Sequence, residues 1–417
     1  MRKRLPPPLQ QRDFSLFWVA ILATGFAGQM MAVAIGWQVY AIHENPLDLG
    51  LIGLAEFLPL PLLALPAGHI ADRLPRRLVF AAAIVLDGLI AGGLLIVTLA
   101  GASSLWPFLA LALAAGSAAA LGWPAARSMP PTLVSTDLLA SAMALRGIAF
   151  QSATIIGPAI GGLLFAARAE LVYVVAAALF VVALVCVLPV TERTEERLLE
   201  AAPSRDALFA GARFVRRTPV LFGAITLDLF AVLFGGAMAL LPVFAKDILD
   251  TGPVGLGILR SSPAVGALVA GVILARRPIR GNAGRTLLVV VAIFGAAMIV
   301  FGLSKSFPLS CAALCLAGFA DMFSMNIRSM TVALATPDEL RGRVNAVEMV
   351  FISGSNELGA FESGIAAALI GAAPAVVLGG VATICIAVIW GRLFPDLRNV
   401  DRLELLRPSR ASAPPST

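Results

Sequence analysis

Residues Gly68 to Arg77 read Gly-His-Ile-Ala-Asp-Arg-Leu-Pro-Arg-Arg, a dense polar segment between two long apolar runs at 47–67 and 78–100. A helix needs roughly 20 residues to cross the hydrocarbon core of a bilayer, which is about 30 Å thick. Each run is long enough to do so. The polar segment is therefore predicted to be a short turn at a membrane surface.

The composition places the whole chain in the membrane. Of its 417 residues, 59% are hydrophobic and 13% charged, and the mean hydropathy is +0.91. Soluble domains carry about twice that share of charges. The net charge of +6 comes from short basic clusters between apolar runs, a pattern that sets membrane orientation. A basic patch with interleaved aromatics is missing, so nucleic-acid binding is excluded as a function.

Twelve apolar spans are predicted, in two sets of six. They cover 14–42, 47–67, 78–100, 104–126, 138–165, 170–190, 219–245, 254–275, 285–303, 309–328, 343–370 and 374–394. The domain organisation that follows is an N-terminal segment 1–13, a six-helix bundle 14–190, a polar central loop 191–218, a second six-helix bundle 219–394 and a polar tail 395–417.

The positive charges predict the orientation. With the N-terminus inside, 26 of the 31 Lys and Arg residues fall in segments on the inner side, and only Arg168, Lys246 and Lys305 fall in outer loops. Positive residues accumulate on the cytoplasmic side of membrane proteins. Both termini and the central loop are therefore expected in the cytoplasm.

An internal repeat links the two halves. Arg127-Ser128-Met129 recurs 201 residues later as Arg328-Ser329-Met330, each at the end of the fourth span of its half. Parallel repeats of this kind are typical of transporters whose substrate site lies near the bilayer midplane.

The polar turn resembles the signature loop of the major facilitator superfamily, Gly-x-x-x-Asp-Arg-x-Gly-Arg-Arg, with Pro75 in place of the second glycine. The positions in register are Gly68, Asp72, Arg73, Arg76 and Arg77. The resemblance implies an all-α membrane fold of 12 transmembrane helices in two pseudo-symmetric bundles. It also implies that Asp72 forms a conformational latch on the cytoplasmic side, with Arg127 and Arg343. The alternative is that the arginines only fix the topology.

The fifth span resembles a second motif, which is associated with antiporters of the superfamily. Its matching residues are Gly157, Pro158, Gly161 and Gly162, with Ala153 where the first glycine would stand. Proline removes a backbone hydrogen bond, and glycines permit close helix approach. The resemblance implies export, and ordinary helix packing is the alternative.

Acidic residues inside spans are candidates for proton coupling, because a charge at the bilayer centre costs at least about 2.5 kcal/mol. By the resemblance, Asp228 and Asp321 belong to helices that line the central cavity, and Glu56 and Glu357 to helices at the seam between the halves. The alternative for each acid is a static ion pair with Arg146, Arg260 or Arg328.

The spans assigned to the cavity also carry polar and aromatic side chains suited to an amphipathic organic substrate. These substrate candidates are Gln29, Trp37, Trp123, Phe230, Phe323 and Asn326. Packing inside the bundles is the alternative for each aromatic.

The segment 336–347, Thr-Pro-Asp-Glu-Leu-Arg-Gly-Arg-Val-Asn-Ala-Val, is similar to the bacterial branch of enterobactin exporters and macrolide efflux pumps. This resemblance implies a monomeric secondary transporter in the bacterial plasma (inner) membrane. It would export small siderophore-like or drug-like molecules by proton antiport, with membrane lipids around it. We expect no cofactor and no metal site, and no enzyme motif is found. The alternatives are a proton-coupled uptake symporter and a lipid-moving or sensory protein on the same fold.

Overall fold

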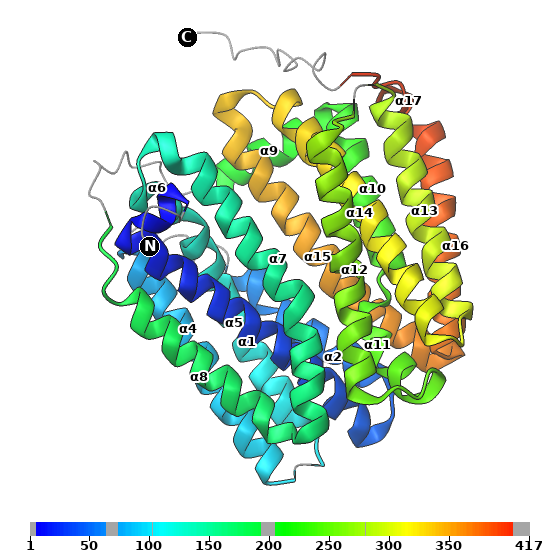
Figure 1. The fold of residues 1–417 in the computed structure, drawn as a ribbon. Coiled ribbons are helices and arrows are strands. Elements are labelled where there is room, and N and C mark those ends of the chain that lie inside the picture. The colour runs from blue at the N-terminus through cyan, green and yellow to red at the C-terminus, as the bar shows by residue number, and fades with distance from the viewer. Residues whose placement is uncertain (1–5, 64–73, 102, 193–204, 280, 403–417) are drawn as a thin grey trace. The chain divides into compact units, whose positions relative to one another are not determined.

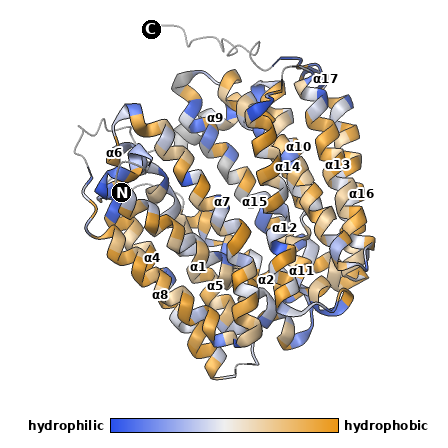
Figure 2. Ribbon diagram, viewed as in Figure 1, coloured by the Kyte–Doolittle hydropathy of each residue, from blue (hydrophilic) through white to orange (hydrophobic). Residues whose placement is uncertain are grey.

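The structure is a computed structural model that describes residues 6–63, 74–101, 103–192, 205–279 and 281–402 (Figure 1). These residues form helices and connecting turns, and no β-strand occurs among them. Hydrophobic residues run along most of each long helix, and hydrophilic residues gather mainly near the helix ends (Figure 2). This is the distribution expected for helices that cross a membrane.

Within the described residues, 11 helices are long and apolar enough to span a membrane. α2 (Pro46–Phe57) and α10 (Pro219–Gly235) continue into spans Pro46–Leu63 and Pro219–Ile248. The other nine are α1 (Arg12–His43), α4 (Arg76–Leu99), α5 (Trp106–Ser128), α7 (Thr136–Ala167), α8 (Ala169–Val187), α12 (Gly252–Arg276), α13 (Ala283–Leu303), α14 (Phe307–Ala335) and α16 (Ala372–Leu393).

The remaining predicted span corresponds to α15 (Asp338–Ile370), which has 33 residues. Its length is ample, but Glu348, Glu357 and Glu362 make it more polar than the others. With α15 included, the helices fit the predicted 12-helix fold in two bundles, so the fold class is confirmed.

Two compact units make up the described fold. Unit 1 contains residues 1–202 and 241–261, and unit 2 contains 203–240 and 262–417. One of the boundaries between them falls inside α12. In unit 1, α1 packs on α7 and α8, α4 packs on α5 and α8, and α2 packs on α5 (Figure 1). In unit 2, α13 packs between α14 and α16, and α10 packs on α15 and α16. Three short helices are η2 (Pro7–Gln10), α6 (Pro130–Leu133) and α17 (Pro395–Arg398).

The seventh predicted span, 219–245, is interrupted where a continuous helix was expected. α10 ends at Gly235, and η3 (Ala237–Leu240), α11 (Leu241–Val243) and the π-helix η4 (Phe244–Ile248) follow. Pro242 lacks the N–H that a regular helix would use here. The Ser363 hydroxyl of α15 donates to the Gly236 carbonyl at 3.1 Å and satisfies one backbone group at the break.

The central segment 191–218 was predicted as a loop, and it contains a helix, α9 (Arg205–Arg217). Phe214 and Val215 are buried in an apolar cluster with residues of α10, α14 and α15, whereas Arg216 and Arg217 are exposed. The helix therefore exists because one apolar face finds a partner. The many charges of this segment concealed that face in the sequence.

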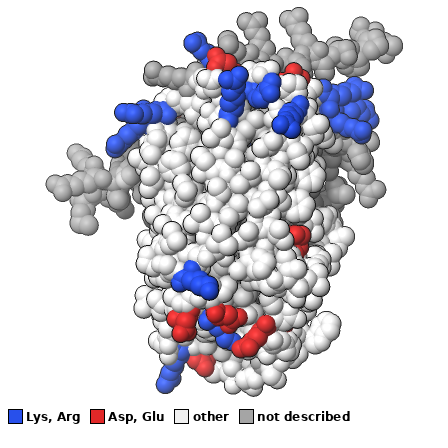
Figure 3. Space-filling model, turned by 90° about the vertical axis from the view of Figure 1, so that its right-hand side faces the viewer, with Lys and Arg blue, Asp and Glu red and all other residues white. Residues whose placement is uncertain are grey.

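Lys, Arg, Asp and Glu gather near the two ends of the helices on the face shown in Figure 3, and few charges lie in the band between. Uncharged surface of this kind is compatible with hydrocarbon. Charged side chains within the helices therefore need a local explanation, and they lead to the candidate site.

Candidate functional site

An ion pair lies inside unit 2. Asp228 of α10 contacts the guanidinium of Arg328 on α14. Asp228 is 7% exposed and Arg328 is 5% exposed. Glu348 of α15 is close enough to Arg328 for an electrostatic interaction. A buried charge needs such a partner because it has lost its hydration. The structure thus supplies one of the ion pairs that the sequence left open for Asp228.

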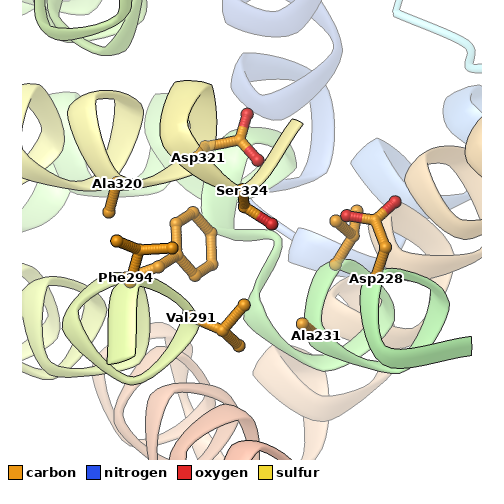
Figure 4. A pocket seen from close by; sticks show the side chains of 9 residues that line it. Asp228, Ala231, Val291, Phe294, Ala320, Asp321 and Ser324 are labelled. Atoms are coloured by element: carbon orange, nitrogen blue, oxygen red, sulfur yellow. The ribbon is translucent and has the colours of Figure 1, made fainter. Parts of the chain in front are cut away.

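A small cavity adjoins this ion pair. It has a volume of about 20 Å³ and is bordered by both leading acids, Asp228 and Asp321. Figure 4 shows Ser324 between the two acids, one turn along α14 from Asp321. The rest of the lining is apolar: Ala231, Val232, Val290, Val291, Phe294 and Ala320. Asp228 and Asp321 therefore border the same cavity, which lies inside unit 2.

Asp321 differs from Asp228 in its surroundings. Asp321 is exposed on α14 and has no ion-pair partner among the residues that the structure describes, whereas Asp228 is buried and paired. A bare carboxylate facing hydrocarbon would be costly. The exposed face of α14 at Asp321 is therefore expected to meet water.

The other two acids lie elsewhere. Glu56, in unit 1, is half-buried and interacts electrostatically with Arg260. Glu357 is half-buried on α15. Neither borders the cavity beside Asp228.

The substrate candidates fall into different environments. Phe230 stacks on Phe234 at 6.5 Å between ring centroids and packs against Trp390 at 5.4 Å, next to the core of unit 2. Phe323 packs on Phe319 at 5.0 Å. Trp123 is 59% exposed on α5. These positions favour packing for Phe230 and leave a ligand role open for Trp123.

Three polar or aromatic candidates remain. Gln29 lies against Gly157, and Asn326 is half-buried on α14. Trp37 and Phe165, 6.5 Å apart between ring centroids, border an open depression of about 460 Å³ in unit 1. Gln38 also lines this depression, and its side-chain amide donates a hydrogen bond to the Thr98 hydroxyl at 3.0 Å.

The signature turn is only partly visible, because Gly68, Asp72 and Arg73 lie outside the described residues. Arg76 donates to the Ser128 carbonyl at 2.6 Å, and Arg77 donates to the Val190 carbonyl at 2.7 Å. These carbonyls lie at or just beyond the C-terminal ends of α5 and α8, where positive charge is favourable. Both arginines therefore hold unit 1 together, in addition to any effect on topology. Arg127 and Arg343 are exposed.

The glycine motif of α7 is a site of close helix contact. A methyl group on Gly157 would lie 2.7 Å from Gln29, and one on Gly161 would lie 2.8 Å from the Met30 backbone of α1. One on Gly162 would lie 2.4 Å from the Pro253 carbonyl of α12. Small residues at these positions are a packing requirement of unit 1.

Sequence reasoning missed a polar cluster where α1 meets η4. Tyr40 donates a hydrogen bond to Asp247, and Lys246 donates to Glu44 at 2.6 Å. The Lys246 ammonium also lies 5.6 Å from the centroid of the Tyr40 ring. The hydrogen bond and charge of Lys246 lower the pKa of Glu44. Because these residues are about 200 positions apart, no local pattern could have paired them.

Long apolar helices arranged in two units are the fold of membrane transporters of the major facilitator superfamily. The family described as "Transmembrane secretion effector" matches residues 6–415. The chain belongs to this family, whose members are membrane transporters and not enzymes.

Named relatives agree with this assignment. The chain is similar to the enterobactin exporter EntS of Shigella boydii serotype 18, with 26% identity over 348 residues that cover 82% of this chain and 80% of the relative. Its fold is similar to that of the nucleoside transporter NupG, with a TM-score of 0.73 and 14% identity over 92% of this chain and 99% of that one. It is also similar to the D-xylose-proton symporter, with a TM-score of 0.71 and 14% identity over 93% of this chain and 99% of that one.

Proposed function

We propose that this protein exports a small amphipathic organic molecule, siderophore-like or drug-like, across the bacterial inner membrane by proton antiport and alternating access. It works as a monomer with both termini in the cytoplasm. The observation that carries the proposal is the cavity bordered by Asp228 and Asp321 beside the Arg328 ion pair. A carboxylate beside an arginine stays ionised while the ion pair is intact and can take up a proton when the pair is broken. Such a group can therefore bind and release protons as its surroundings change.

The direction of transport is supported by two observations. The relatives similar over most of the chain are named as enterobactin exporters, and α7 carries the antiporter-type glycines packed on α1 and α12. The proposed substrate class is supported by the exposed aromatic side chain of Trp123, which suits an amphipathic molecule. Asp72 is proposed to keep the cytoplasmic entrance closed during part of the cycle.

The test is transport in everted membrane vesicles with an imposed proton gradient. Native vesicles should accumulate substrate when their interior is acidic, and Asp228→Asn and Asp321→Asn should abolish this accumulation while leaving substrate exchange partly intact. Asp87→Asn is the matched control, because Asp87 lies on α4, away from the cavity. Full activity of both cavity variants would refute the coupling role.

The same vesicles separate the alternatives. Substrate that leaves the everted vesicles together with protons would identify an uptake symporter. Lipid movement in proteoliposomes without proton-coupled solute flux would identify a lipid-moving protein. Either result would replace the export proposal.

A further inference from the structure

We propose that the small cavity in unit 2 holds one ordered water molecule, and that this water passes a proton between Asp321 and Asp228. The inference rests on the proposed function, because it assigns a path to the proton that antiport requires. It adds a site, a water ligand and a positioning residue, Ser324.

The cavity has the size and polarity for one water. Its volume is about 20 Å³, and a cavity needs about 10–15 Å³ to hold a water molecule with two to four polar partners. The residues at its border that carry polar side chains are Asp228, Asp321 and Ser324. The apolar residues around them offer no competing hydrogen bonds.

Ser324 supports a water molecule in the cavity independently of the two acids. Ser324 as a whole residue is 5% exposed, and its hydroxyl makes no hydrogen bond to another residue that the structure describes. Buried hydroxyls without a partner are costly, and most are satisfied by protein or by ordered water. Figure 4 shows this side chain in the gap between Asp321 and Asp228. A water in the cavity would satisfy it.

The proton moves from Asp321 to Asp228 through the water in one transfer step. The O–H bond of protonated Asp321 breaks, the water accepts that proton, and one of the water's own protons forms a new O–H bond on Asp228. The water is unchanged, and one proton has moved from the exposed acid to the buried one. Asp228 then no longer offers Arg328 a negative charge, so Arg328 becomes free to interact more strongly with Glu348.

The charged groups around this path are few. Asp228 comes from α10, Asp321 and Arg328 come from α14, and Glu348 approaches Arg328 from α15. The α13 residues at the cavity are apolar. Proton exchange with the outside therefore enters through Asp321, the exposed member of the set.

The experiment is infrared difference spectroscopy of the purified full-length protein in lipid nanodiscs after a step in pH. Asp228→Asn and Asp321→Asn assign the two carboxyl bands. An internal water band should appear that shifts in water enriched in heavy oxygen and that changes in both variants. Protonation of Asp228 should follow that of Asp321.

Variants of Ser324 test the water directly. Ser324→Val fills the cavity and removes the hydroxyl, so the water band should vanish and protonation of Asp228 should slow at least about tenfold, the factor that corresponds to one lost hydrogen bond in the path. Ser324→Ala removes the hydroxyl and leaves the room, so a shifted band should remain. Ser310→Val, at a fully buried serine of the same helix, should leave the band unchanged.

A missing water band in the native protein would overturn the proposal. So would a band, or a rate of Asp228 protonation, that Ser324→Val leaves unchanged. The spectra need no substrate and no gradient, so they decide the relay even if everted vesicles show no proton-driven export.

Discussion

Replacing Asp228 by Asn perturbs the ion pair of unit 2 at its most buried point. Asp228 and Arg328 are 7% and 5% exposed, and the substitution leaves the guanidinium facing a neutral amide. Removal of one partner of a buried ion pair costs about 3–5 kcal/mol. The Asn carbonyl still accepts one hydrogen bond from Arg328, and Glu348 still interacts with it. We therefore expect a loss near the lower end, about 3 kcal/mol.

The assay compares stability with transport. Unfolding by denaturant in mixed micelles, followed by the helical circular dichroism signal, gives the free energy of unfolding, and everted vesicles give proton-driven accumulation. A double variant, Asp228→Leu with Arg328→Met, separates the two properties. Replacement of a buried ion pair by apolar residues is often neutral or stabilising. The double variant should therefore recover the free energy of unfolding and still lack proton-driven transport.

Two results would refute this reasoning. A loss below about 1 kcal/mol in Asp228→Asn would show that the ion pair is solvated, as exposed ion pairs are. Proton-driven transport by the double variant would show that the ion pair only supports the fold. Asp87→Asn is the control, since Asp87 lies within α4 and has no ion-pair partner among the described residues; its transport should remain native.

Three further predictions concern packing, the tail and pH. Gly161→Ala should cost about 1–3 kcal/mol by overpacking on α1, measured by the same unfolding assay, whereas Gly147→Ala on the same helix has open space and should gain up to about 1 kcal/mol. Truncation after Asn399 should lower the melting temperature because it removes the backbone hydrogen bonds to the start of α13, and truncation after Arg402 should not. Above about pH 4.3, Lys246→Gln should melt at a lower temperature than the native protein, because Glu44 has lost its partner. The difference between the two proteins should vanish on acidification, when Glu44 becomes protonated.

Most of the fold could be predicted because a membrane imposes one strong rule on sequence. Apolar runs of sufficient length become helices, and polar turns such as 68–77 separate them. The rule fails where a helix is amphipathic, as in α9, because averaging over its charges hides the apolar face that packs on α15. It also fails at Pro242, where hydropathy continues but the backbone hydrogen bonds cannot.

The acidic residues of the candidate site could be predicted from the sequence, but the cavity that they border could not. Asp228 and Asp321 stood out because charges are rare in apolar spans. Their shared cavity depends on how α10, α13 and α14 pack, which periodicity within one helix does not encode. Ser324 could have been found from α14 alone, since Asp321, Ser324 and Arg328 follow the i, i+3, i+7 spacing of one helical face.

The internal repeat gives an independent reason to assign these acids a function. Arg12, Leu16 and Phe17 match Arg217, Leu221 and Phe222 at an offset of 205 residues, and at this offset Ala23 corresponds to Asp228. At the 201-residue offset of the Arg-Ser-Met repeat, Ala120 corresponds to Asp321. If the acids served only to hold the repeated scaffold together, both copies would need them. Ala23 and Ala120 are buried in unit 1 and pack without charge. Unit 1 therefore folds without acids at these two positions, which supports the proposed role of Asp228 and Asp321 in proton coupling.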